Sequence, residues 1–260
     1  AQHEGTLMSP PGRPKGEYRS AQHEGTLMSP PGRPKGEYRS AQHEGALMGT
    51  TALPSTRPFG LGLNQAQALL CTAGVACCVA MSMPQVHIVA YCGDLGYGAA
   101  RGAQMLSLML ACGIVSRLVS GAICDRIGGL RTLLLGSVLQ GLALLLFIPF
   151  DSLSSLYLIS ALFGLFQGGI VPSYAIIVRE YFPPAEAGAR VGTVLMATLF
   201  GMALGGWMSG KVFDLSGSYR AAFINGVGWN LLNLSIVWLL MSRLRAERRR
   251  QSDRSVQYPT

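Results

Sequence analysis

Charged side chains are scarce in this sequence. Only 13% of its 260 residues are Asp, Glu, Lys or Arg, whereas a soluble domain carries about 25%. The run Asn64–Gly93 contains none. Because 49% of the residues are hydrophobic, the composition excludes an ordinary soluble domain and predicts an integral membrane protein.

Catalytic and metal-binding groupings are also missing. No Ser/His/Asp set, no pair of carboxylates within an apolar stretch and no His/Glu cluster occurs, so we expect no enzyme and no metal or other cofactor. The six cysteines lack metal-ligand spacing and are expected to behave as small hydrophobes. The net charge of +8 comes from residues that flank apolar segments, which favours anionic membrane lipids as partners and argues against nucleic acid.

The first part of the chain is a tandem duplication. The unit AQHEGTLMSPPGRPKGEYRS at Ala1–Ser20 recurs at Ala21–Ser40, and a third copy begins at Ala41. Each unit is rich in Pro, Gly and charge and has too few large apolar residues to bury a shared face. We expect residues 1–64 to form a disordered basic tail and not a solenoid with a twenty-residue period.

Six long apolar stretches follow the tail. Each approaches or exceeds the roughly 20 residues that cross a 30 Å hydrocarbon core. They are residues 66–92, 102–124, 132–150, 153–178, 191–210 and 221–242. We expect an all-α membrane protein, with a bundle of six transmembrane helices over residues 65–242 and a basic cytoplasmic tail at 243–260. Arginine is concentrated in the tails and in the loops at 125–131 and 179–190, so the positive-inside rule predicts that both termini are cytoplasmic.

Arg117 is the only charged side chain inside the six stretches. It lies about 12 Å along its helix from Asp125, at roughly 1.5 Å per residue, which places it near the middle of the bilayer. An arginine at that depth costs roughly 2.5–3.5 kcal/mol on insertion scales. It therefore requires a partner, an aqueous cavity or an anionic ligand. The alternative is a structural role in which the guanidinium bridges backbone carbonyls of two helices.

Two loops of the chain are similar in sequence. Ser120–Arg131 and Ser209–Arg220 share Ser, Gly, Asp, Gly and Arg at a constant offset of 89 residues. With three spans per half, these loops fall on opposite sides of the membrane, the pattern of two inverted three-helix repeats. The alternative is that these residue types are simply common at helix ends.

The loop Gly121-x-x-x-Asp125-Arg126-x-Gly128-Gly129-x-Arg131 resembles the cytoplasmic loop motif of the major facilitator superfamily, in the position between helices eight and nine of twelve. Four stretches of the chain resemble bacterial members of the monocarboxylate and oxalate/formate branch of this superfamily. They are MPQVHIVAYCGDLG, SRLVSGAICDRIGG, GLFQGGIVPSYAIIVREYF and FDLSGSYRAAF. The resemblance implies the C-terminal six-helix half of a carrier in a bacterial inner membrane. Such a carrier moves a small organic anion, for example a monocarboxylate, by alternating access.

The resemblance also implies roles for individual residues. An arginine of helix eight binds the substrate carboxylate in that branch, and Arg117 occupies the matching place with a guanidinium fork that fits a carboxylate. The chain departs from the branch at Gly113, where eukaryotic monocarboxylate carriers have an aspartate, and in Val191–Ser209, which lacks the lysine of the oxalate/formate exchanger. The transport mode, whether uniport, proton symport or exchange, is therefore left open.

Other polar residues are candidates beside Arg117. His87 follows the kink expected at Pro84, where an imidazole can relay protons, donate to a ligand or bond to a neighbouring helix. Gln167, Tyr174 and Asn230 can line a cavity or bond between helices. The loop motif is expected to gate, with Asp125 and Arg126 pairing to Glu180 or Arg190, or else only to end helices. The gating set is Gly121, Asp125, Arg126, Gly128, Arg131, Glu180 and Arg190.

One bundle is half of what such a carrier needs, because its site lies between two six-helix bundles. The chain is expected to be a fragment, a half-carrier that dimerises, or a bundle that pairs with a separate N-terminal half. The lack of a methionine at residue 1 and the duplicated tail favour the first. A non-transporting remnant or interaction module is the alternative from another class.

Overall fold

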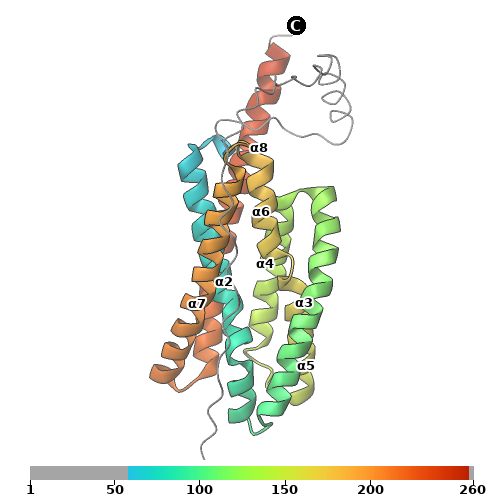
Figure 1. The fold of residues 1–260 in the computed structure, drawn as a ribbon, viewed down its shortest axis with the longest axis vertical. Helices are drawn as coiled ribbons and strands as arrows, with labels where there is room; N and C mark the ends of the chain where they lie inside the picture. Colours follow the sequence, from blue (N-terminus) through green and yellow to red (C-terminus); the bar gives the residue numbers. More distant parts are fainter. Residues whose placement is uncertain (1–57, 258–260) are drawn as a thin grey trace, which may run out of the picture. The chain divides into compact units, whose positions relative to one another are not determined.

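The computed structural model describes residues 58–257, so the predicted tail lies outside the described residues up to Arg57. The described part is a bundle of helices joined by short loops (Figure 1). Six of its spans are long and apolar enough to cross a membrane, which confirms the predicted all-α fold. The elements are η1 Pro58–Gly60, α2 Leu63–Asp94, α3 Ala99–Ile127, α4 Gly129–Leu146, α5 Leu153–Gln167, α6 Ile170–Tyr181, α7 Ala187–Ser216 and α8 Tyr219–Gln257.

Successive spans run in opposite directions through the bundle (Figure 1). The loop between α3 and α4 lies at one end and the loop between α7 and α8 at the other. The two loops that are similar in sequence therefore lie at opposite ends of the bundle, as the inverted repeat predicts. The first repeat consists of α2, α3 and α4, and the second of α5–α6, α7 and α8.

The fourth span is kinked where α5 ends and α6 begins. Pro172 has no N–H to donate to the carbonyl of Gly168, four residues earlier, so the helical hydrogen bonding is interrupted there. Pro84 lies inside α2, which remains one helix. Both prolines therefore occur at expected positions, but only the kink at Gly168–Gly169 divides a span into two helices.

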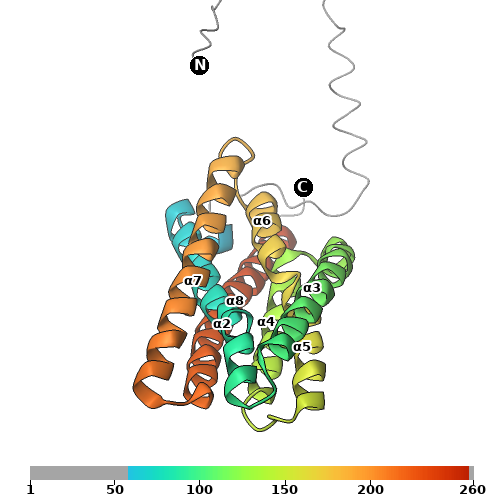
Figure 2. The same ribbon diagram turned by 60° about the horizontal axis from the view of Figure 1, so that its bottom comes forward.

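Glycines bring two pairs of helices into close contact. A Cβ atom added to Gly164 of α5 would lie 2.2 Å from the carbonyl oxygen of Met109 in α3. On the other side of the bundle, a Cβ on Gly201 of α7 would lie 2.6 Å from the carbonyl oxygen of Val75 in α2. Small residues allow such backbone approach between transmembrane helices. The bundle is thus held by an α3–α5 contact and an α2–α7 contact, and α3 and α7 lie on opposite sides of it (Figures 1 and 2).

The folded part extends beyond the predicted limits at both ends. Phe59 belongs to the segment expected to be tail, but it is only 2% exposed, and its ring lies 4.8 Å from that of Tyr181 at the end of α6. At the other end, α8 continues past residue 242 to Gln257. Arginine is a good helix former, so the basic segment prolongs the last span as a helix.

Candidate functional site

Arg117 lies on an exposed face of α3. The opposite face of this helix packs on the kinked span through buried residues such as Met109, Gly113 and Ser116. The Arg117 side chain is exposed, and it makes no hydrogen bond or ion pair with any residue that the structure describes. The expected alternative, a guanidinium bridging backbone carbonyls within the bundle, is therefore not what is observed.

The surroundings of Arg117 on that face are apolar. Leu118 is 75% exposed and Ile114 is 61% exposed, and Val115 and Val119 are exposed as well. If this face met lipid, the arginine would be held among acyl chains at a cost of roughly 2.5–3.5 kcal/mol. A water-filled cavity or a second protein surface removes that cost. The face is thus incomplete in a single bundle, and we treat it as the candidate site.

The kink of the fourth span is packed against α3 next to Arg117. A Cβ on Gly168 would lie 2.3 Å from the carbonyl oxygen of Gly113 and 2.7 Å from the Cβ of Ser116, the residue before Arg117. Gln167 directly precedes the kink, is 4% exposed, and its Oε1 has no hydrogen-bond partner among the described residues. Gln167 is therefore adjacent in sequence to Gly168, which packs against Gly113 and Ser116 of α3.

His87 is engaged on the other side of the bundle. Its Nε2 lies 3.2 Å from the carbonyl oxygen of Gly206 in α7, and its ring lies 6.4 Å from the ring of Tyr219 at the start of α8. An Nε2–H tautomer donates to that carbonyl. Of the roles expected for His87, the structure contains the bond to a neighbouring helix, and it directs the imidazole toward α7 and not toward α3.

Tyr174 and Asn230 lie in a buried polar network inside the bundle. The Tyr174 hydroxyl donates to Asn233 Oδ1 at 3.1 Å, and Asn233 Nδ2 donates to Ser137 Oγ at 2.8 Å. Asn230 Nδ2 donates to the Ser137 carbonyl oxygen at 3.0 Å. These bonds link α4, α6 and α8. Because Tyr174 is 0% and Asn230 1% exposed, both residues connect helices and neither reaches the surface that carries Arg117.

The loop motif holds the start of α4. Gly128 has φ +85° and ψ 159°, a backbone conformation that favours glycine. The amide of Gly129 donates to both carboxylate oxygens of Glu180, at 3.1 and 3.2 Å. Unpaired N–H groups and the helix dipole make the N-terminus of a helix a favourable place for a carboxylate. Glu180 therefore ties the end of α6 to the beginning of α4.

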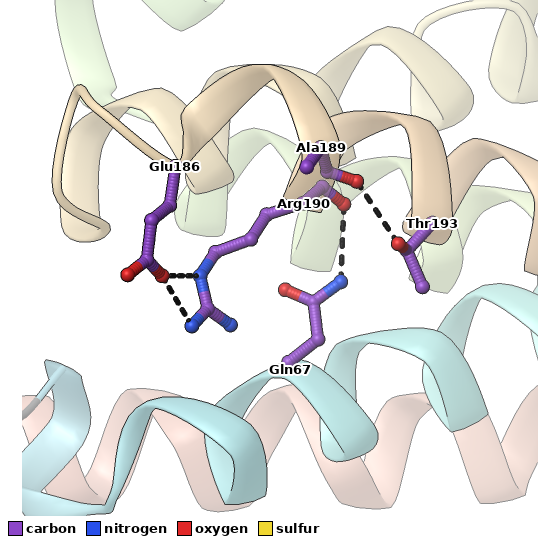
Figure 3. Close-up of polar contacts among 5 residues, drawn as sticks. All are labelled: Gln67, Glu186, Ala189, Arg190 and Thr193. Atoms are coloured by element: carbon purple, nitrogen blue, oxygen red, sulfur yellow. Dashed lines mark hydrogen bonds and ion pairs between the residues drawn. The ribbon is translucent and has the colours of Figure 1, made fainter.

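Arg190 is paired within the start of α7. Its Nε and a terminal nitrogen donate to Glu186 Oε2 at 2.8 and 2.6 Å (Figure 3). Its guanidinium carbon lies 5.2 Å from the Phe182 ring centroid. Its carbonyl oxygen accepts from Gln67 Nε2 of α2 at 3.0 Å (Figure 3). Glu186 and Gln67 were not among the predicted residues. The spacing of Glu186 and Arg190, one helical turn apart, is the signal that identifies the first.

The predicted pairing of Asp125 and Arg126 with Glu180 or Arg190 is wrong for this arrangement. Glu180 already accepts from the Gly129 amide, and Arg190 is already paired with Glu186, the residue directly before α7. Asp125, Arg126 and Arg131 are exposed and make no ion pair within residues 58–257. Gly121 is partly buried on α3 with no atom within 4 Å of a Cβ built there.

Comparison with known proteins adds to this geometry. The sequence model of the Major Facilitator Superfamily matches residues 50–257. The chain is 30% identical over 144 residues to Monocarboxylate transporter 13 of Rattus norvegicus, covering 55% of this chain and 34% of that protein. It is 30% identical over 153 residues to Probable anion transporter 7 of Oryza sativa subsp. japonica, covering 57% and 34%. Multidrug export protein EmrB of Haemophilus influenzae is 25% identical over 135 residues, covering 50% and 26%. The matched part of the chain thus spans 26–34% of the length of these relatives.

Proposed function

Because the chain belongs to the major facilitator superfamily, we propose that it forms half of a secondary transporter that moves a small organic anion, such as a monocarboxylate, by alternating access. Arg117 is the residue that contacts the carboxylate in this proposal. The observation that supports it most is an exposed guanidinium at mid-depth of α3 that has no ion-pair partner within residues 58–257. The names of the relatives, a monocarboxylate transporter and an anion transporter, agree with this substrate class.

A second six-helix bundle completes the site in this proposal, either another copy of the chain or a separate N-terminal half. The apolar face around Arg117 then meets protein and an enclosed cavity instead of lipid. A guanidinium in such a cavity presents a planar fork of donors to the two carboxylate oxygens. Gln167, beside the kink, is the proposed second polar residue of the site, whereas His87, Tyr174 and Asn230 stabilise the bundle around it.

The end that carries the α3–α4 loop is the proposed cytoplasmic end, in a bacterial inner membrane. The arginines in the helix ends that flank this loop and the α6–α7 loop, and those at the end of α8, lie there, so the positive-inside rule favours this orientation with both termini inside. Asp125 and Arg126 are exposed at this end. The gating function proposed for the loop motif is therefore a pairing of these charges with the second bundle.

Uptake of radiolabelled lactate into proteoliposomes, together with lactate-induced thermal stabilisation of the full chain, tests the proposal. We expect Arg117→Ala to abolish the stabilisation and any uptake, and Arg117→Lys to retain part of both because the charge stays while the fork is lost. Arg101→Ala is the matched control, since it removes an exposed arginine from the other end of the same helix. If wild type and Arg117→Ala show neither stabilisation nor uptake, the chain is not a carrier on its own, which leaves a non-transporting remnant or interaction module, or a bundle that requires a separate N-terminal half.

A further inference from the structure

The outermost face of α8 carries a continuous stripe of exposed residues. Ile224, Leu231 and Trp238 recur every seven residues and are 58%, 57% and 56% exposed. The same face continues with Ser242, Arg245 and Arg249, which are also exposed. Positions seven and eleven apart lie on one side of an α-helix. The stripe therefore changes from apolar to basic along the helix axis, and it faces away from the α2, α4 and α7 helices on which α8 packs.

The change occurs at the edge of the hydrocarbon core. No charged residue lies between Arg220 and Arg243, so the membrane boundary falls close to Ser242. Trp238 lies just inside it, at the level where exposed tryptophans are enriched in membrane proteins. The Ser242 hydroxyl is occupied, because it donates to the Trp238 carbonyl oxygen at 2.8 Å.

Arg245 turns back toward the membrane instead of away from it. Its guanidinium carbon lies 5.7 Å from the centroid of the Trp238 ring, two helical turns earlier. Side chains on a helix lean toward its N-terminus, and the cation–π contact with the indole holds the guanidinium at the interface. Among the described residues Arg245 and Arg249 have no ion-pair partner. Asp253, the next acid along this face, is not paired with either.

We infer that Trp238, Arg245 and Arg249 form a binding site for the phosphate headgroup of an anionic phospholipid, with an acyl chain lying along Leu231 and Ile224. Two arginines one turn apart supply donors that match a phosphate, and the indole supplies the apolar body and the interfacial depth. An acidic peptide would bind the two arginines but would leave the apolar part of the stripe without a partner. The inference rests on the membrane location of α8 and is independent of the function proposed for Arg117.

Quenching of Trp238 fluorescence by brominated lipids tests this site in the full chain. Trp207→Phe and Trp229→Phe leave Trp238 as the only one of the 3 tryptophans. In mixed vesicles we expect brominated phosphatidylglycerol to quench Trp238 in strong preference to brominated phosphatidylcholine, by about thirtyfold, given roughly 1 kcal/mol for each of the two arginines near an anionic surface. The variant Arg245→Gln/Arg249→Gln should lose most of this preference.

The matched control removes the same charge from another face of α8. Arg243 and Arg250 are exposed but lie off the stripe, so Arg243→Gln/Arg250→Gln should keep most of the preference. Equal losses in the two double variants would show only a general attraction of the basic helix to anionic membranes and would overturn the site. So would the absence of any preference in the parent protein. If millimolar inorganic phosphate abolishes the preference through Arg245 and Arg249, the ligand is soluble phosphate and the lipid assignment is wrong.

Discussion

The inverted repeat places Arg117 and Gly206 at equivalent positions, separated by the same offset of 89 residues as the two loops. Arg117 lies on α3, which packs on the kinked span of the other repeat, and Gly206 lies on α7, which packs on α2. Around Gly206 the contact is complete, because His87 of α2 bonds to its carbonyl oxygen. Around Arg117 no described residue provides a partner. Two related contacts thus differ in whether the bundle satisfies its own polar groups.

This difference indicates which contact is structural. The α2–α7 contact combines close glycine packing with an interhelical hydrogen bond, both of which stabilise a membrane bundle. The α3–α5 contact has the same close packing, but the residue beside it is a charge that the bundle leaves unpaired. An unpaired arginine at that depth is costly, so its retention favours a role outside the single bundle. The predictions that follow separate the two contacts by their effects on stability and on anion binding.

Replacing Arg117 by leucine should have the largest effect on the bundle. Arg117→Leu removes a cost of roughly 2.5–3.5 kcal/mol for an arginine at mid-bilayer, so the free energy of unfolding of the single bundle in lipid should rise while anion binding is lost. Steric trapping or reversible unfolding in bicelles measures the first quantity. A fall in the free energy of unfolding would mean that the guanidinium stabilises the bundle. It would contradict the distinction between the α2–α7 contact as structural and the Arg117 face as functional.

Filling the glycine contacts should destabilise both sides alike. Gly164→Ala and Gly201→Ala place a Cβ 2.2 and 2.6 Å from backbone carbonyl oxygens, and overpacking of this kind costs about 1–3 kcal/mol. Thermal unfolding in detergent measures the loss. Gly192→Ala is the control, because nothing lies within 4 Å of its Cβ and alanine is the better helix former. If Gly164→Ala is tolerated, the α3–α5 contact is looser than the α2–α7 contact.

Removing Glu180, which joins the end of α6 to the start of α4, should have a smaller effect. Glu180→Ala leaves the amide of Gly129 without its carboxylate, and the loss of such a cap costs about 0.5–2 kcal/mol. Glu186→Ala removes an exposed pairing one turn from Arg190, which is worth about 0.3–0.5 kcal/mol. Chemical denaturation of both variants measures the difference. Equal losses would show that Glu180 contributes no more than a surface ion pair.

Hydropathy and loop charge predicted the helices well, because both depend on local composition. Most span ends were expected within about four residues, whereas α7 ends at Ser216 and not at 210, and α8 ends at Gln257 and not at 242. Arg117 was identified as the unusual group from its isolation in the sequence. Partner choice was predicted poorly. Glu180 was expected to meet Asp125 or Arg126, but it binds the backbone amide of Gly129. Which helix end lies beside a carboxylate depends on tertiary packing, and backbone amides leave no signal in a sequence.

Polar residues inside the spans show the same limit. Tyr174, Asn230 and His87 were expected either to face a cavity or ligand or to bond between helices, and each bonds to a neighbouring helix in the structure. A hydroxyl, an amide or a neutral imidazole can be satisfied by another helix at little cost. A guanidinium carries five N–H donors, more than the oxygen of one neighbouring carbonyl can accept. Charge is therefore a better sequence signal for a ligand site in a membrane bundle than polarity alone.

His87 provides the smallest and most discriminating test. His87→Phe breaks the bond to the Gly206 carbonyl and keeps an aromatic ring beside Tyr219, so it should cost about 0.6 kcal/mol, the average for interhelical hydrogen bonds in a membrane protein. It should leave lactate-induced stabilisation unchanged, because the imidazole is directed toward α7 and α8. The pH dependence of uptake should likewise be unchanged. Loss of pH dependence with stability intact would instead assign His87 to proton coupling, and the α2–α7 contact would then belong to the transport mechanism along with the Arg117 face.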